Sequence, residues 1–121
     1  MSQEINQFID DLKRQEAAVK TVASYLSDLN CFARWFAGSM GEEFAAANVT
    51  PIDIRDYRSH LQTVQGAKPA TINRRLATLR RFFGWAVGAG VISENPTSLV
   101  KGVQSVPLGP KSPERREVDR L

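Results

Sequence analysis

One stretch with the apolar period of an α-helix, residues 68–90, restricts most strongly how this chain can fold. Its apolar residues recur at intervals of three and four, which places them on one stripe of a 3.6-residue helix: Ile72, Leu76, Leu79, Phe83, Ala86 and Val87. Lys68 or Thr71, together with Pro69, suits the start of this helix, and Gly88 and Gly90 suit its end. The sequence therefore predicts a long amphipathic helix here.

The same stretch is strongly basic. It carries five basic residues and no acid, namely Lys68, Arg74, Arg75, Arg80 and Arg81. At 100° per residue, the polar side opposite the apolar stripe holds Asn73, Arg74, Ala77, Thr78 and Arg81. Arg75 and Arg80 flank the stripe, where they can instead pair with acids of the bundle. We predict a helix with an apolar back and a cationic front.

Three further segments, at about residues 2–15, 20–37 and 50–64, also show helical periods of apolar residues. Thr21 is expected to cap the second and Thr50 the third, with glycines ending the second helix at Gly38 and Gly41. No segment alternates as a strand does, so the predicted fold is all-α. The expected core contains Phe8, Leu12, Leu26, Leu29, Phe32, Ile54, Leu61, Leu76, Leu79 and Phe83.

The charge of this chain is polarised. The net charge is only +3, yet residues 1–50 hold four basic and seven acidic residues while residues 68–90 hold five basic and none acidic. One basic face directed at a polyanion fits this pattern better than a uniformly charged surface does.

Catalytic chemistry finds little support in the sequence. The single histidine, His60, has no partner set for acid–base work, and the single cysteine, Cys31, excludes a disulfide within the chain. No zinc spacing and no phosphate-binding glycine loop occur, so we expect no cofactor, no metal and no small-molecule substrate. No apolar run is long enough for a membrane helix and no signal peptide is evident, so a cytoplasmic location is expected.

Several short motifs resemble one known module. Residues 71–76 (TINRRL), 79–83 (LRRFF), 90–92 (GVI) and 95–96 (NP) are similar to the last long helix of the N-terminal core-binding, SAM-like domain of tyrosine recombinases, the phage integrase family. Lys20-Thr21, Tyr25, Asp28-Leu29 and Phe32 resemble its second helix, and residues 49–61 its third. The resemblance implies a SAM-like bundle of four to five helices, arranged as two crossed helical hairpins.

The resemblance also implies a function. Such a domain lays its second and last helices on duplex DNA and forms half of a clamp, in a protein that assembles further recombinase subunits on DNA as a tetramer. The matching contact candidates are Lys20, Thr21, Ser24, Lys68, Thr71, Asn73, Arg74, Arg75 and Arg81. The tyrosine nucleophile of the family belongs to a C-terminal catalytic domain whose motifs are not present here. We expect this chain to bind DNA and not to cleave it.

The expected domain organisation follows the same comparison. Residues 1–100 form the DNA-binding domain, and residues 101–113, with three prolines and two glycines, read as an extended linker. Residues 114–121 resemble the start of a truncated catalytic domain.

Two other functions remain open on sequence grounds. A helical protein–protein interaction module shares the same fold class, and a helix-turn-helix regulator would also pair two helices through a short turn. DNA binding that weakens steeply with salt, by roughly 0.9 in log slope per neutralised phosphate, distinguishes the first alternative from the DNA-binding hypothesis.

Overall fold

The computed structural model describes residues 3–15 and 17–103, and every regular element in them is helical. The four α-helices are α1 (Gln3–Arg14), α2 (Val19–Met40), α3 (Pro51–Ser59) and α4 (Pro69–Gly88). A 3-10 turn, η1 (Ala46–Asn48), precedes α3, and a π-helical segment, η2 (His60–Val64), extends it. The prediction of an all-α fold is confirmed for the described part of the chain.

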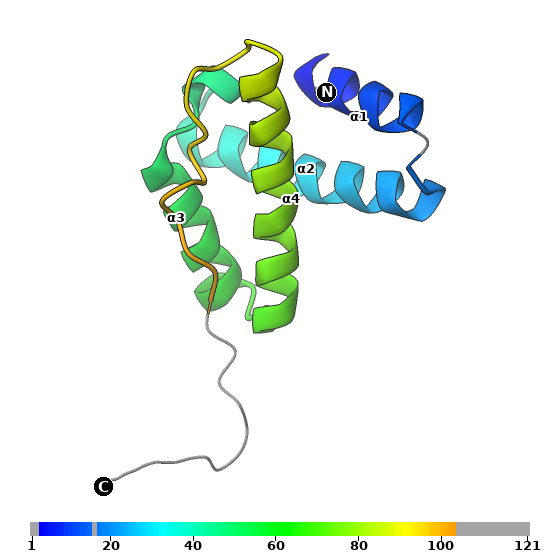
Figure 1. The fold of residues 1–121 in the computed structure, drawn as a ribbon. Helices are drawn as coiled ribbons and strands as arrows, with labels where there is room; N and C mark the ends of the chain where they lie inside the picture. The colour runs from blue at the N-terminus through cyan, green and yellow to red at the C-terminus, as the bar shows by residue number, and fades with distance from the viewer. Residues whose placement is uncertain (1–2, 16, 104–121) are drawn as a thin grey trace, which may run out of the picture.

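The helices form two hairpins that cross. Helices α1 and α2 make one hairpin, while α3 with η2 packs beside α4 to make the other (Figure 1). Helix α4 crosses α2 and also contacts α1, so it packs against both helices of the other hairpin. This is the SAM-like arrangement expected from the sequence, and it places the basic helix at the junction of the two hairpins.

Aromatic rings hold the crossing together. Phe32 of α2 lies 5.0 Å from the Tyr57 ring of α3 and 6.4 Å from the Phe83 ring of α4, measured between centroids. Phe8 of α1 meets Phe82 of α4 edge to face at 5.5 Å. All five rings are at most 2% exposed, and burying each contributes about 1.5–3 kcal/mol. The apolar stripes read from the sequence thus converge on one core.

The start of α3 follows its sequence signals closely. The Asp53 amide donates to Thr50 Oγ1 and the Thr50 amide donates to Asp53 Oδ2, which forms a reciprocal capping box. Pro51 occupies the first turn, where its missing N–H costs nothing. Val49 and Ile54 are both buried, as a hydrophobic staple at this spacing requires.

The boundaries of α2 differ from the prediction. Thr21 is not its cap, because the Ala17 amide already donates to the Leu12 carbonyl and turns the chain earlier, so that Ala18 takes the N-cap position. The helix also passes through the exposed Gly38 and ends at Gly41, whose φ of 70° is the left-handed conformation that stops a helix. Both errors arise because glycine and threonine are permitted at a helix end and do not dictate it.

Three predicted side-chain positions are also wrong. Thr78, expected on the cationic front of α4, is 2% exposed, because α2 crosses α4 at this point and covers it. Leu26, expected in the core, is only half-buried and packs against its edge. Val87, the last residue of the predicted apolar stripe, is 37% exposed because it lies in the final turn of α4. The other predicted core residues are buried.

After α4, the chain returns along the α3–α4 hairpin. Thr97 and Val100 are buried in a turn, and residues 101–103 continue beside α3 and α4 (Figure 1). The remainder of the expected linker and residues 114–121 lie outside the described residues. None of the described helices combines the length and apolar character needed to cross a lipid bilayer.

Candidate nucleic-acid interface

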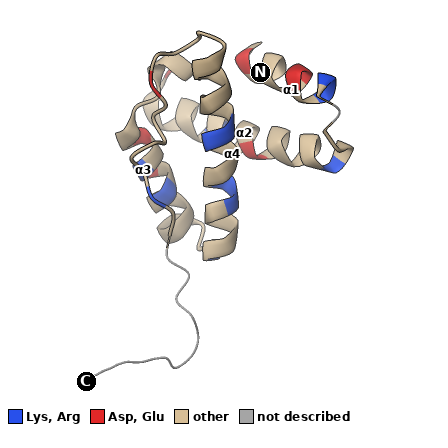
Figure 2. Cartoon of the chain, in the orientation of Figure 1, with Lys and Arg blue, Asp and Glu red and all other residues tan. Residues whose placement is uncertain are grey.

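The side of α4 that points away from the core carries two arginines separated by small residues. Arg74 and Arg81 are both exposed and lie seven residues apart, which is about two helical turns. The remaining exposed residues on this side are Ala70, Ala77, Gly84 and Gly88. Basic bands therefore follow α4 (Figure 2), and little side-chain bulk separates the helix from an approaching polyanion.

A buried carboxylate lies where α4 crosses α2. Asp28 is 4% exposed, and its two oxygens accept hydrogen bonds from Arg74 Nη1 at 2.8 and 3.0 Å and from Thr78 Oγ1 at 2.8 Å. A buried carboxylate is unfavourable unless it is paired and hydrogen-bonded, so these donors stabilise it. About half of the Arg74 side chain stays exposed, and this leaves its guanidinium open to solvent on one side.

The crossing also brings predicted residues of α2 to α4. Ser24 Oγ accepts a hydrogen bond from Arg74 Nη1 at 3.1 Å, although fifty residues separate the two in sequence. Lys20 precedes Ser24 by one turn, and both Lys20 and Thr21 are exposed. The predicted contact residues of the two helices therefore lie on neighbouring surfaces.

The N-terminal end of α4 is positively charged in two ways. Lys68 occupies the N-cap position and is exposed, and Thr71 stands half-buried in the first turn. No acidic residue lies in that turn, so the unpaired backbone amides and the helix dipole add to the charge of Lys68. Such an end is suited to an anion.

Asn73 is engaged within the fold. Its Nδ2 donates to the Val103 carbonyl at 2.9 Å, and its Oδ1 accepts from the Val103 amide at 2.8 Å. Gly102 allows this approach, because a Cβ there would lie 2.5 Å from Asn73 Oδ1. Contact of Asn73 with a base would require both hydrogen bonds to be released.

Two arginines secure the same returning segment. Arg58 Nη1 donates to the Lys101 carbonyl at 2.6 Å, and Arg80 Nη2 donates to the Val100 carbonyl at 3.3 Å. Arg80, one of the five basic residues of the basic stretch, thus has a place in the fold. With Asn73, these side chains fix residues 100–103 along the α3–α4 hairpin.

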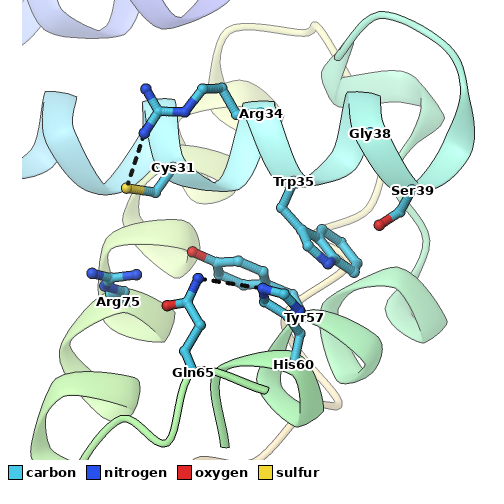
Figure 3. A pocket seen from close by; sticks show the side chains of 9 residues that line it. All are labelled: Cys31, Arg34, Trp35, Gly38, Ser39, Tyr57, His60, Gln65 and Arg75. Carbon is cyan, nitrogen blue, oxygen red and sulfur yellow. Dashed lines mark hydrogen bonds between the residues drawn. The ribbon is translucent and has the colours of Figure 1, made fainter. Parts of the chain in front are cut away.

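Arg75 points to a different region from Arg74. It is half-buried and lines a pocket with Tyr57, on the side of α4 that faces α3 (Figure 3). Burial raises the pKa of Tyr57 above its ordinary value, and the nearby Arg75 guanidinium opposes that rise. Arg74 and Arg75, although adjacent in sequence, therefore lie on different surfaces of α4.

Arg81 has no hydrogen-bond or ion-pair partner among residues 3–15 and 17–103. Asp11 of α1 lines the same hollow, but its carboxylate accepts from the Arg14 guanidinium and from the Trp85 indole. The positive charge of Arg81 therefore remains available to a ligand.

Asp28 was not identified from the sequence as the buried acceptor that joins α2 to α4. Its signal was an acid set among the apolar residues of α2, adjacent to Leu29 and one turn after Tyr25, and this pattern indicates a buried partner. Arg34 was also overlooked; it lies on the exposed side of α2, two turns after Ser27. Within the described residues, no group of three potential metal-ligating side chains occurs.

A profile described as "Phage integrase, N-terminal SAM-like domain" matches residues 5–90, which contain all four helices apart from the first two residues of α1. The chain belongs to this family. The family relationship inferred from the motifs of α2 and α4 is thus confirmed.

Similar proteins are tyrosine recombinases. The chain is 30% identical over 118 residues to "Tyrosine recombinase XerD" of Ralstonia nicotianae, covering 97% of this chain and 37% of that protein. It is 34% identical over 105 residues to XerD of Rhizobium meliloti, covering 87% and 32%. It is 34% identical over 101 residues to "Tyrosine recombinase XerC" of Thermodesulfovibrio yellowstonii, covering 83% and 31%.

The chain spans about a third of the length of these curated relatives. No solved structure gives a significant match to it.

Proposed function

We propose that this chain is a double-stranded-DNA-binding domain of a site-specific tyrosine recombinase. The observation that carries the proposal is the shared surface of α2 and α4, where Arg74 donates to Ser24 and pairs with Asp28, while the exposed Lys20 lies one turn before Ser24 and the exposed Arg81 two turns after Arg74. Relatives that bear the name of tyrosine recombinases supply the biological setting. Cutting and rejoining of DNA are assigned to parts of the protein other than this domain.

The proposed contacts fall into two groups. Lys20, Lys68 and Arg81 neutralise phosphates, and Thr21 and Thr71 donate hydroxyl hydrogen bonds to them. Arg74 uses its exposed half for DNA while Asp28 and Ser24 fix its orientation. An arginine held in this way loses less rotamer freedom on binding, and that favours a defined contact with a base edge or a phosphate. Asn73 and Arg75 remain candidates that would act only after rearrangement or at a neighbouring site.

Further subunits of the same recombinase are proposed as protein partners. A hollow of about 400 Å³ between α1 and α2 has a mainly apolar lining that includes Val22 and Leu26, and Val19 at its edge is 85% exposed. This surface favours a protein neighbour, which is also what the alternative of a pure protein-interaction module would use. Salt dependence of DNA binding separates the two.

The test is a titration of this chain against a fluorescent mixed-sequence duplex between about 50 and 200 mM salt. We expect affinity to fall steeply with salt, and the Arg81→Ala variant to bind more weakly with a log slope smaller by about 0.9. Arg55→Ala is the matched control, because Arg55 is an exposed arginine on α3 outside the proposed surface. Absence of binding at low salt, or equal binding by the Arg81 and Arg55 variants, would contradict the proposal.

A further inference from the structure

A pocket outside the shared surface of α2 and α4 has the properties of an anion site. It measures about 550 Å³, within the range of small-ligand sites, and lies between α2, the α3–η2 segment and α4 (Figure 3). Cys31, Arg34 and Trp35 line it from α2, Tyr57 and His60 from α3 and η2, and Arg75 from α4. Three elements distant in sequence thus contribute to one concave surface.

Two polar atoms in this pocket lack the partners that burial demands. The Tyr57 side chain is almost fully enclosed, with 2% of the residue exposed. Its hydroxyl lies near the Arg75 guanidinium, which lowers the pKa of the phenol, yet it makes no hydrogen bond of normal geometry and has no acceptor among the described residues. The buried Nε of Arg75 is likewise without an acceptor among the described residues. Buried polar atoms nearly always have a partner, and two exceptions in one pocket indicate a ligand that supplies acceptor oxygens.

The charge of the lining gives the sign of that ligand. Arg34 and Arg75 are both cationic, and none of the described residues that line the pocket is acidic. Among the residues that the structure describes, the Arg34 guanidinium makes a single, weak hydrogen bond, to the Cys31 sulfur at 3.7 Å, so its donors can turn to a ligand. Burial raises the pKa of Tyr57, so its hydroxyl keeps its proton at neutral pH and can donate.

An aromatic wall completes the site. The Trp35 ring lies 5.1 Å from the Tyr57 ring and 6.0 Å from the His60 ring, measured between centroids. His60 begins the π-helical segment η2, whose wider turn is a frequent feature of ligand sites, and its Nε2 lies 3.3 Å from Gln65 Nε2. Flat apolar rings beside a cationic floor suit an anion attached to a sugar or a base.

We propose that this pocket binds a phosphate group, with the Arg75 guanidinium and the Tyr57 hydroxyl donating to its oxygens and Arg34 covering its open side. Arginine guanidiniums match the several oxygens of a phosphate in geometry and charge. The phosphate comes either from a DNA backbone or from a free nucleotide. The first source rests on the proposed function, whereas the second does not.

The experiment follows the Arg75 Nε–H and Trp35 Nε1–H signals of ¹⁵N-labelled protein by NMR. The chain is titrated with inorganic phosphate, deoxyadenosine monophosphate and a mixed-sequence duplex, each beside sodium chloride and sodium acetate at equal ionic strength. We expect saturable shifts of both signals with the phosphate compounds and not with chloride or acetate. The Trp85 indole, which lies outside this pocket, should stay unchanged with inorganic phosphate and the mononucleotide, whereas duplex DNA can also shift it because it lines the hollow of Arg81. Shifts with the mononucleotide identify a free source, and shifts with the duplex only identify the DNA backbone.

Two variants separate binding from folding. Tyr57→Phe keeps the ring and removes a hydroxyl that has no partner, so the thermal stability should be equal or higher while phosphate affinity falls at least about fivefold. Arg75→Gln should abolish the saturable shift of the Trp35 indole, and Arg55→Gln should leave it intact. Equal shifts with chloride or acetate, or unchanged affinity in Tyr57→Phe, would overturn the proposal.

The outcomes also separate this site from DNA binding as a whole. Duplex binding that depends on Arg81 but not on Tyr57 or Arg75, with no saturable nucleotide shift, would refute the pocket and leave the proposed function standing. Nucleotide shifts without salt-sensitive duplex binding would refute the proposed function and leave the pocket standing.

Discussion

The two ends of the basic face of α4 differ in what surrounds their arginines. Near its start, Arg74 donates to Ser24 and to the buried Asp28, and these contacts join α4 to α2. Two turns later, Arg81 is exposed and has no partner among the described residues. The sequence presents both as members of one cationic run. Their environments show that a positive charge facing outward can be part of the fold, part of a ligand site, or both.

The largest difference we expect is in stability. Arg74→Ala removes the counter-ion of a carboxylate that is 4% exposed, and the free energy of unfolding should fall by about 2–3 kcal/mol. The exposed half of Arg74 keeps this below the cost of a fully buried pair. Arg81→Ala should change stability by less than about 0.5 kcal/mol. Urea unfolding followed by circular dichroism measures both, and similar losses in the two variants would remove the distinction.

Thr78 tests the same cluster independently, because it is the second donor to the Asp28 carboxylate. Its hydroxyl donates to Asp28 Oδ2 at 2.8 Å and is buried, so Thr78→Val should cost about 1–2 kcal/mol at nearly constant volume. Because Arg74 and Thr78 share one acceptor, the double variant should depart from additivity by at least about 0.5 kcal/mol. Strict additivity in a double-mutant cycle would mean that the cluster does not act as a unit.

The positions of the helices could be predicted from the sequence, whereas their ends could be predicted only in part. Apolar periodicity located four helices because a buried stripe is a local property of the sequence. The Thr50 cap was correct because Asp53 and Pro51 gave the same answer independently. Thr21 and Gly38 misled because each suits a helix end without requiring one, and the connection from α1 decided where α2 begins.

The candidate site was predictable in its residue types and not in its partners. Ser24 and Arg74 were both selected, but their hydrogen bond depends on a crossing between hairpins that no local pattern encodes. Thr78 was expected on the outer face because a helical projection ignores what packs against a flank. The pairing of Asn73 with Val103 likewise joins residues thirty positions apart through tertiary structure.

Asn73 offers a smaller test of whether a polar residue of α4 serves the fold, as Arg74 does, or a ligand, as Arg81 does. Asn73→Ala removes two hydrogen bonds to Val103, and amide hydrogen exchange at Val103 should accelerate about tenfold, equivalent to about 1.4 kcal/mol of local stability.

The same amide reports on DNA in the unmodified chain. If Asn73 contacts a base, adding duplex DNA should speed exchange at Val103, because both hydrogen bonds must open. Slowed or unchanged exchange would assign Asn73 to the fold alongside Arg58, which holds Lys101, two residues before Val103. Exchange at the Ile54 amide, bonded to the Thr50 carbonyl at the start of α3 and outside the proposed surface, serves as the control.

The smallest effect concerns an arginine that faces a phenol in place of an acid. Burial raises the pKa of Tyr57 above its ordinary value of about 10, so the folded state holds this proton more tightly than the unfolded state. The resulting stabilisation is complete below pH 10 and is lost as the pH rises through the folded-state pKa. Tyr57→Phe should flatten this part of the stability profile. Arg75→Gln removes the charge that opposes the rise and should move the loss to higher pH. Overlapping alkaline profiles of the unmodified chain and Tyr57→Phe would show that the buried phenol does not couple to folding. Their separation, together with the shift to higher pH in Arg75→Gln, would assign Arg75 an electrostatic role distinct from those of both Arg74 and Arg81.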